Sequence, residues 1–193
     1  MDLDAFYMAE MDEHAAVAAA TRSALKEPFK RLLGAAAAAI RGGGKIVLFG
    51  NGGSAGDAQH LATELTVRYK KDRAPIAAIA LTTDTSALTA IGNDLGFDNL
   101  FSRQVEALCR KGDLVLGIST SGNSENVIRA LKKAKEMGCV AAALGGRGGG
   151  RLVDVADPLL VVPSDTTARI QEMHITLGQM LCGALELELG LVR

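Results

Sequence analysis

One segment of the sequence gathers hydroxyl side chains immediately before a stretch of helical periodicity: Ser119, Thr120, Ser121 and Ser124. The N-terminus of a helix presents free backbone N–H groups and the positive end of the helix dipole. Hydroxyl groups at such a point are therefore well placed to bind a phosphate group. A simpler interpretation is that Ser121 or Ser124 only caps the helix. Because one cap needs one hydroxyl and four are present, the pattern favours phosphate binding.

A second set of polar side chains is spaced by three or four residues and is expected to share one face of a helix: Asp57, His60, Glu64 and Arg68. A histidine and a glutamate four residues apart can bind one metal ion, and a carboxylate beside a bound sugar can act as a base. Such a pair is more often only a solvated helix face. Its position one turn after a glycine-rich loop favours a functional role for His60 and Glu64.

That glycine-rich loop contains Asn51, Gly52 and Gly53 and directly follows an apolar run. Glycine allows the backbone to approach a ligand closely. The loop also fits the pattern G-x-G-x-x-A of dinucleotide-binding proteins, but the acidic residue expected at the end of the next strand comes late, at Asp84. No G-x-x-x-x-G-K-[ST] motif occurs, which excludes a P-loop. A dinucleotide site is therefore the weaker interpretation.

A third set of polar residues lies in a long apolar helix predicted from residue 167 to about residue 189. Gln171, His174 and Gln179 each need a polar partner if they are buried. A metal ion or a sugar would supply such a partner. Hydrogen bonds across a subunit contact are an equal alternative.

These separated segments need a scaffold that brings them together. Short apolar runs that end in Gly, Ser or Thr alternate with stretches of helical periodicity: 45–50, 75–83, 113–120, 139–146 and 157–164. This alternation predicts a three-layer, doubly wound α/β domain with a parallel five-stranded sheet covered on both faces. In such a sheet, ligands bind at the carboxyl ends of the strands, where the loops described above are expected to lie.

Residues 1–193 are predicted to form a single domain, because no linker or internal repeat is visible. Two helices are expected before the first strand, at about 2–22 and 26–41. The N-terminal helices of residues 1–41 could pack on their own domain or on a neighbouring subunit.

Composition limits the classes of function. Hydrophobic residues make up 48% of the chain and the formal net charge is −1 without a long basic run, so no nucleic-acid partner is expected. No apolar stretch reaches the roughly 18–20 residues that cross a bilayer, so no membrane association is expected. The acidic start lacks the features of a signal peptide. Cys109, Cys139 and Cys182 form no CxxC pair, which predicts buried thiols in a reduced, cytoplasmic protein.

Taken together, the motifs resemble those of the phosphoheptose isomerases (sedoheptulose 7-phosphate isomerases) of the sugar isomerase (SIS) superfamily. The resemblance covers about residues 40–190 and rests on five segments in the family's order: GNGGSAGDAQHLATEL, ALTTDTSALTAIGND, FSRQVEAL, GISTSGNSENV and RIQEMH. It implies a flavodoxin-like SIS domain, Zn²⁺ as cofactor, and a homotetramer with active sites at subunit interfaces. It also implies conversion of the sugar phosphate sedoheptulose 7-phosphate to D-glycero-D-manno-heptose 7-phosphate, which serves lipopolysaccharide or capsule synthesis.

The resemblance also assigns roles to individual residues. His60, Glu64 and Gln171 match metal ligands of the family, and Glu64 also matches its catalytic base. The substrate-binding positions match the following residues: Asn51, Gly52, Gly53, Glu64, Arg68, Asn93, Asp94, Ser119, Thr120, Ser121, Ser124 and Gln171.

One position departs from the family. Gln179 occupies the place of a histidine that is the fourth metal ligand and shares acid–base catalysis with the glutamate. Glutamine can bind a metal through its carbonyl oxygen but cannot transfer a proton near pH 7. The predicted enzyme is therefore impaired by Gln179, or His174 or a water takes the proton role, or the glutamine is a deliberate substitution. A non-catalytic SIS branch that binds the replication initiator also lacks this histidine, but it tends to lack the glutamate that is retained here as Glu64.

Overall fold

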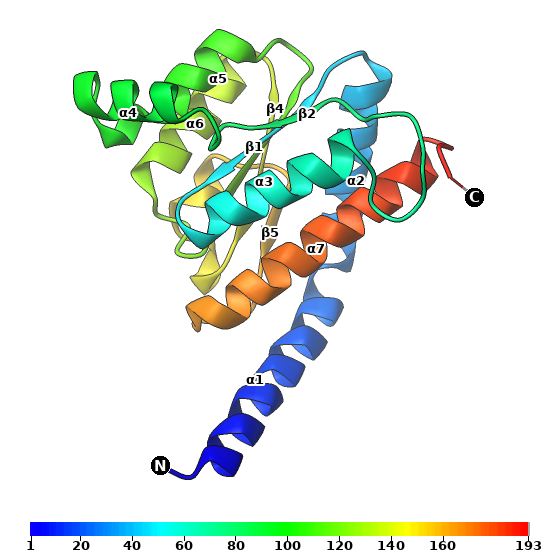
Figure 1. The fold of residues 1–193 in the computed structure, drawn as a ribbon, viewed down its shortest axis with the longest axis vertical. Coiled ribbons are helices and arrows are strands. Elements are labelled where there is room, and N and C mark those ends of the chain that lie inside the picture. Colours follow the sequence, from blue (N-terminus) through cyan, green and yellow to red (C-terminus); the bar gives the residue numbers. More distant parts are fainter. Residues whose placement is uncertain (193) are drawn as a thin grey trace.

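The apolar runs of the sequence form a single parallel sheet, whose strands follow one another in space in the order β2-β1-β3-β4-β5 (Figure 1). The computed structural model describes residues 1–192, and its strands are β1 (Ile46–Gly50), β2 (Ala78–Ala80), β3 (Leu114–Ser119), β4 (Val140–Gly145) and β5 (Leu159–Val161). The chain adds β2 on one side of β1 and then crosses to β3 on the other side. The carboxyl ends of β1 and β3 are thus the point where the winding reverses, which is the usual place for a ligand.

Helices cover both faces of the sheet, as the continuous apolar character of the strands predicts. One face carries α2 (Lys26–Arg41), α3 (Gly53–Thr66) and α7 (Thr167–Glu188), and the other carries α4 (Thr85–Asp94), α5 (Ser102–Leu108) and α6 (Glu125–Glu136). Alternate side chains of β1 serve the two layers: Ile46 and Leu48 enter the first core, and Val47 and Phe49 enter the second. The predicted three-layer fold is confirmed.

The two edge strands are shorter than predicted from the sequence. The apolar runs 75–83 and 157–164 contain only the three-residue strands β2 and β5. An edge strand pairs on one side only, so fewer of its residues are held in a hydrogen-bonded ladder. All residues of the central strands β1 and β3 are buried.

The first helix, α1 (Leu3–Ala24), leaves the body of the protein at its N-terminal half (Figure 1). Towards its middle it contacts the start of α7: His14 Nδ1 lies 2.8 Å from Glu172 Oε2, and Arg169 donates to the backbone oxygen of Glu10 at 2.6 Å. The helix therefore packs partly on its own domain. None of the helices formed by residues 1–192 is long and apolar enough to cross a membrane.

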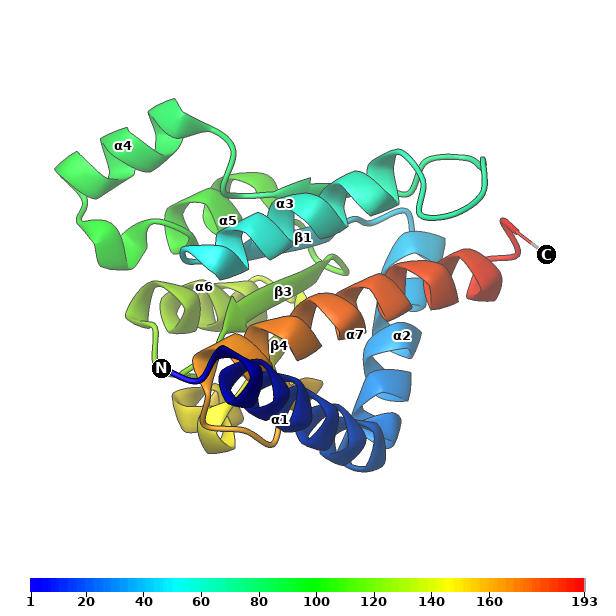
Figure 2. The same cartoon turned by 60° about the horizontal axis from the view of Figure 1, so that its bottom comes forward.

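Helices α3 and α7 lie side by side over the same face of the sheet (Figure 2). Their close approach depends on Gly178, because a Cβ atom at that position would lie 2.4 Å from a methyl carbon of Leu61. This contact brings the polar residues predicted on the two helices towards one another.

Candidate active site

The loops that follow β1 and β3 are neighbours because the two strands pair with each other up to Gly50 and Ile118. We call residues 50–53 the glycine loop and residues 119–124 the hydroxyl loop. A Cβ atom on Gly50 would lie 2.8 Å from the carbonyl oxygen of Ile118, so the two backbones are in close contact where the loops begin. The glycine loop then turns at Gly52, whose φ of +55° favours glycine.

The hydroxyl loop leaves the N-terminus of α6 open. Ser124 occupies the N-cap position, but its side chain makes no capping hydrogen bond. Its Oγ instead lies 3.0 Å from Oγ of Ser119, and Ser121 accepts a hydrogen bond from the backbone N–H of Asn123. The simpler interpretation, in which Ser124 serves only as a cap, is therefore wrong. A hydroxyl-rich turn, which also contains Thr120, thus directly precedes the N-terminus of α6, where the first N–H groups of a helix lack partners in the preceding turn.

A second loop, which the sequence reasoning missed, supports the hydroxyl loop. Gly122 has a φ of +68°, and a Cβ atom there would lie 2.1 Å from the carbonyl oxygen of Gly149. The backbone N–H of Arg151 donates to Oδ1 of Asn123 at 3.1 Å. The signal that could have revealed this support is the run of glycines at 148–150 directly after β4, all with positive φ.

The first turn of α6 also carries Glu125, whose charge would oppose a bound anion. Its carboxylate accepts hydrogen bonds from Arg129 at 2.8 Å and from Arg151 at 2.6 Å. These bonds from Arg129 and Arg151 lower the pKa of Glu125 to about 2. The carboxylate is thus ionised but paired with two cations, so it does not leave a net negative charge at the mouth of the hydroxyl loop.

The predicted pair on α3 is joined by one residue of α7. His60 Nε2 lies 3.0 Å from Oε1 of Glu64 and 3.5 Å from Nε2 of Gln179. The side chain of Glu64 is 19% exposed and that of His60 47% exposed, so a ligand can reach both. Three of the four predicted metal ligands therefore meet at one point.

The prediction that Arg68 shares this helix face is wrong. Helix α3 ends at Thr66, and Val67 leaves the helical conformation with φ −103° and ψ −80°. Arg68 lies exposed in the loop that follows. Its spacing from Glu64 matches a helix that the chain does not continue.

Asp57 lies on the same helix, one turn before His60, and is half-buried. Its Oδ2 is covered and has no hydrogen-bond partner among residues 1–192. Burial raises the pKa of Asp57, and the nearby His60 partly opposes this effect. A carboxylate oxygen in this position would accept a hydrogen bond from a bound ligand.

The two glutamines of α7 reach different ends of α3. The amide of Gln171 rests on the glycine loop, because a Cβ atom on Gly53 would lie 2.4 Å from Gln171 Nε2. Gln179, two turns further along α7, meets His60. Gln171 thus lies against the glycine loop, and Gln179 lies with the His60–Glu64 pair.

His174 points away from this site into the protein core. It is fully buried, and its Nε2 lies 3.0 Å from the carbonyl oxygen of Gly145 at the end of β4. Burial lowers the pKa of His174 to about 4, against a weaker opposing effect of the bond to Gly145. A covered, neutral histidine cannot exchange protons with a substrate near pH 7. The alternative in which His174 replaces the missing histidine is therefore wrong.

Asn93 and Asp94, which the resemblance places at the substrate, lie at the end of α4. Both are exposed, and Nδ2 of Asn93 donates to Oδ1 of Asp94 at 2.7 Å. Helix α4 lies on the opposite face of the sheet from α3, which carries Glu64 (Figure 1). Within one chain these two residues are therefore not part of the group around Glu64.

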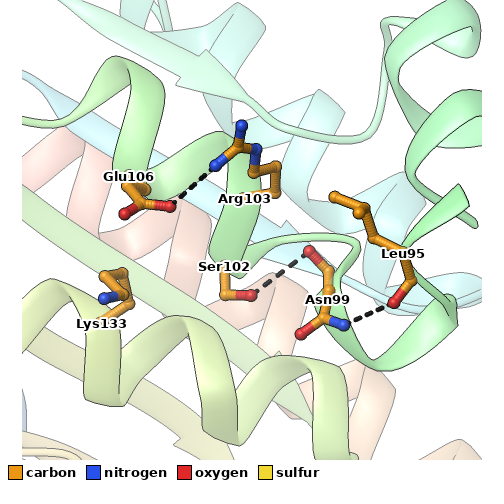
Figure 3. Close-up of a pocket in the computed structure, with 6 residues that line it drawn as sticks. All are labelled: Leu95, Asn99, Ser102, Arg103, Glu106 and Lys133. Atoms are coloured by element: carbon orange, nitrogen blue, oxygen red, sulfur yellow. Dashed lines mark hydrogen bonds and ion pairs between the residues drawn. The ribbon is translucent and has the colours of Figure 1, made fainter.

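A separate cavity of about 340 Å³ lies between η1 (Phe97–Asn99), α5 and α6 (Figure 3). Its two cations are already paired, Arg103 with Glu106 at 3.2 Å and Lys133 with Glu136 at 2.8 Å. This cavity therefore offers no unpaired positive charge for a phosphate, and the hydroxyl loop remains the better candidate.

Comparison with known proteins agrees with this geometry. The profile of the SIS domain matches residues 10–146. A phosphoheptose isomerase of Paramagnetospirillum magneticum is 55% identical over 96% of this chain and 97% of its own length, and one of Aquifex aeolicus is 60% identical over 79% and 80%. The chain belongs to the phosphoheptose isomerase family of SIS-domain proteins. The resemblance seen in the sequence is thereby confirmed.

The solved phosphoheptose isomerases show how far the similarity extends. The structure from Neisseria gonorrhoeae has a TM-score of 0.89 and 46% identity, covering 95% of this chain and 98% of its own. The structure from Francisella tularensis has a TM-score of 0.92 and 34% identity, covering 97% and 99%. Because the match includes nearly the whole chain, α1 and α7 belong to the family fold as much as the sheet does.

Proposed function

We propose that the protein is an aldose–ketose isomerase that converts sedoheptulose 7-phosphate to D-glycero-D-manno-heptose 7-phosphate. The observation that carries the proposal is the open N-terminus of α6, where Ser119 and Ser124 face each other without capping the helix. The relatives named phosphoheptose isomerase, at 55–60% identity, support the same reaction. The product would enter the synthesis of the heptose units of lipopolysaccharide or capsule.

The hydroxyl loop fixes the substrate by its phosphate. Hydroxyl and backbone N–H donors of the loop surround the phosphate oxygens, and the dipole of α6 favours the negative charge. The phosphate is remote from the carbons that react. Its role is therefore to hold the sugar in one orientation, so that C1 and C2 lie near Glu64.

Glu64 moves the proton between C1 and C2. Removing a proton from a carbon beside a carbonyl needs a base close to that carbon, and the resulting enediol is reprotonated on the neighbouring carbon. A carboxylate that is 19% exposed in the last turn of α3 meets both needs, because it is accessible and held by the helix.

The side chains around His60 fit a divalent cation, and we propose that they hold Zn²⁺. With the Gln179 amide nitrogen facing the ring, Nε2 of His60 would have to donate to Glu64 and also accept from Gln179. Turning the amide over brings its oxygen to the same point. His60, Glu64 and Gln179 would then bind the ion, and Gln171, which lies against the glycine loop in this structure, would have to turn towards them to serve as the fourth ligand. When bound, zinc would polarise the oxygens at C1 and C2.

This set of donors is weaker than a usual zinc site. Among residues 1–192, no three His, Cys, Asp or Glu side chains are placed to hold a metal ion, so the site depends on two amide oxygens. Gln179 supplies such an oxygen but no proton near pH 7. We therefore propose an active but impaired enzyme, in which Glu64 carries the proton transfer without a second acid–base group from the chain.

We further propose a homotetramer with its active sites at subunit interfaces. Arg68, Asn93 and Asp94 match substrate-binding positions but lie exposed, away from the group around Glu64. A neighbouring subunit could bring them to the site. The projecting half of α1 exposes large apolar side chains that such a contact would cover: Leu3, Phe6, Tyr7, Met8 and Met11. A cavity of about 590 Å³ between α1, α2 and α7 offers a second surface of this kind.

A reduced, cytoplasmic protein remains our proposal for its location. All three cysteines are free and buried, in agreement with thiols that serve only as core residues.

The test combines an isomerisation assay with metal analysis. Purified protein is incubated with sedoheptulose 7-phosphate, and product and bound metal are measured before chelation, after chelation and after zinc is added back. We expect slow turnover that chelation removes and zinc restores. A metal-free protein without turnover would instead support a non-catalytic SIS protein of the type that binds the replication initiator.

A further inference from the structure

Asn126 forms a hydrogen-bonded link between the two loops of the candidate site. Its Oδ1 accepts from Nδ2 of Asn51 at 2.9 Å, and its Nδ2 donates to Oδ1 of Asn51 at 2.9 Å. Asn51 belongs to the glycine loop. Asn126 lies in the first turn of α6, whose N-terminus carries the hydroxyl loop. The reciprocal pair thus joins the loop after β1 to the loop after β3.

The pair is a constrained contact rather than a flexible surface bond. Asn126 is only 2% exposed, so its amide has no free access to water and needs protein partners. Below the pair, β1 and β3 are held together up to Gly50 and Ile118, with no space for a Cβ atom between them. Two parallel hydrogen bonds between planar amides therefore fix both the separation and the relative tilt of the loops.

We propose that Asn126 is a positioning residue, which holds the glycine loop at one distance from the hydroxyl loop without touching the substrate itself. The inference rests on the function proposed above. A sugar phosphate of this length would span both loops, with the phosphate on the hydroxyl loop and the sugar passing the glycine loop towards Glu64 in the last turn of α3. An error in the spacing of the loops would displace C1 and C2 from Glu64 while the phosphate remained bound.

A positioning role predicts different effects on the affinities for two ligands, whereas a general loss of stability would affect both affinities alike. Inorganic phosphate occupies the hydroxyl loop alone, so it does not sense the glycine loop. Sedoheptulose 7-phosphate occupies both loops. Breaking the Asn51–Asn126 pair should therefore weaken the binding of the sugar phosphate much more than the binding of inorganic phosphate.

The experiment measures the Kd of both ligands by calorimetry for the wild type and for Asn126→Ala. We expect the Kd of sedoheptulose 7-phosphate to rise by about tenfold or more, since small displacements of a bound substrate have large effects. The Kd of inorganic phosphate should change by less than about twofold, because its own contacts are intact. Equal changes for both ligands, or no change for either, would overturn the proposal.

A double variant keeps the test decisive. Asn51→Ala breaks the same pair from the less buried side, but Asn51 also matches a substrate-binding position, so this variant serves as the background in which Asn126→Ala is measured again. In the double variant, the effect of Asn126→Ala should disappear, because its partner is already absent. Effects that simply add would show that Asn126 does not act through Asn51.

The matched control is Asp113→Ala, which removes a buried polar link between β1 and β3 at their opposite ends. It should lower the thermal stability and leave both Kd values unchanged. A wild type that binds sedoheptulose 7-phosphate without converting it would overturn the proposed reaction, while the comparison of Kd values would still decide the role of Asn126.

Discussion

The two ends of the central strands β1 and β3 carry polar links of opposite character. At the amino ends, Asp113 accepts hydrogen bonds from the backbone N–H of Lys45 at 2.9 Å, from Lys45 Nζ at 2.6 Å and from the backbone N–H of Arg110 at 2.8 Å. At the carboxyl ends, the hydroxyls of Ser119 and Ser124 bond to each other and do not cap α6, which leaves the N-terminus of that helix available to a ligand. The first end is complete without a ligand, and the second is not.

The difference shows how one pair of strands serves both stability and function. Burial raises the pKa of Asp113, but the hydrogen bonds from Lys45 and Arg110 outweigh it, so the pKa lies below its usual value and the charge is held at neutral pH. Polar groups that remain without partners at the other end lower the stability of the folded protein. Only a bound ligand restores that stability. Substitutions at the amino ends should therefore mainly change stability, and those in the candidate site should mainly change activity.

The largest expected effect lies in the candidate site, at the base on α3. Glu64→Gln preserves the shape of the side chain but removes the base, so kcat should fall by about 10³-fold, or roughly 4 kcal/mol of barrier. The thermal unfolding midpoint should stay close to that of the wild type. Glu106→Gln on α5 is the control, because it changes an exposed carboxylate that contacts Arg103 outside the site. Wild-type turnover in Glu64→Gln would exclude Glu64 as the base.

The next effect lies at the amino ends and is one of stability. Asp113→Ala leaves Lys45 without its partner in a position where the Asp113 side chain is only 3% exposed. The free energy of unfolding, measured with urea, should fall by about 3 kcal/mol, the lower part of the range for broken buried ion pairs. The KM and kcat of the folded variant should match those of the wild type. A loss of activity larger than the loss of folded protein would contradict the division between the two ends.

The fold was largely predictable because it depends on patterns that are local in the sequence. Five apolar runs with intervening helices predict a parallel sheet whatever the details of packing. The ends of the elements were harder to predict. Arg68 continues the helical spacing of His60 and Glu64, yet α3 ends at Thr66. The edge strands shorten because pairing on one side is a property of the sheet, not of their residues.

The candidate site was predictable in its residue types but not in its contacts. The hydroxyl loop and the His60–Glu64 pair follow from spacing within one segment. The pair of Asn51 and Asn126 joins residues 75 positions apart, and only the crossing between β1 and β3 brings them together. The burial of His174 was equally hidden, because its helix carries polar residues on more than one side.

A smaller effect concerns the pH dependence of stability at the carboxyl end of β4. The pKa of His174 is about 4 in the folded protein against 6.5 for an ordinary histidine, so the unfolded chain binds the proton more readily between these values. Neutral His174 therefore contributes to the free energy of unfolding. This contribution is complete above pH 6.5, is lost as the pH falls towards 4, and amounts to at most about 3 kcal/mol. His174→Gln keeps a donor for Gly145 but does not titrate. The free energy of unfolding of this variant, measured with urea, should therefore fall less steeply with decreasing pH than that of the wild type over the same range. Equal slopes would exclude His174 as the source of the pH dependence.

The smallest expected effect is a gain in the candidate site, where α7 meets α3. Gln179→His places an imidazole within reach of His60 and Glu64, where it can both bind zinc and exchange a proton near pH 7. Turnover should rise by about tenfold, which is less than the roughly 10²–10⁴-fold of a well-placed acid–base group because the metal is weakly bound. Zinc affinity, measured by competition with a chelator, should rise with it.

Gln59→His on the exposed side of α3 is the control, because Gln59 bonds to the carbonyl oxygen of Thr82 and not to His60. If Gln179→His changed neither turnover nor zinc affinity, then position 179 would have no part in the chemistry. The unsatisfied contacts of His60 would in that case need another explanation.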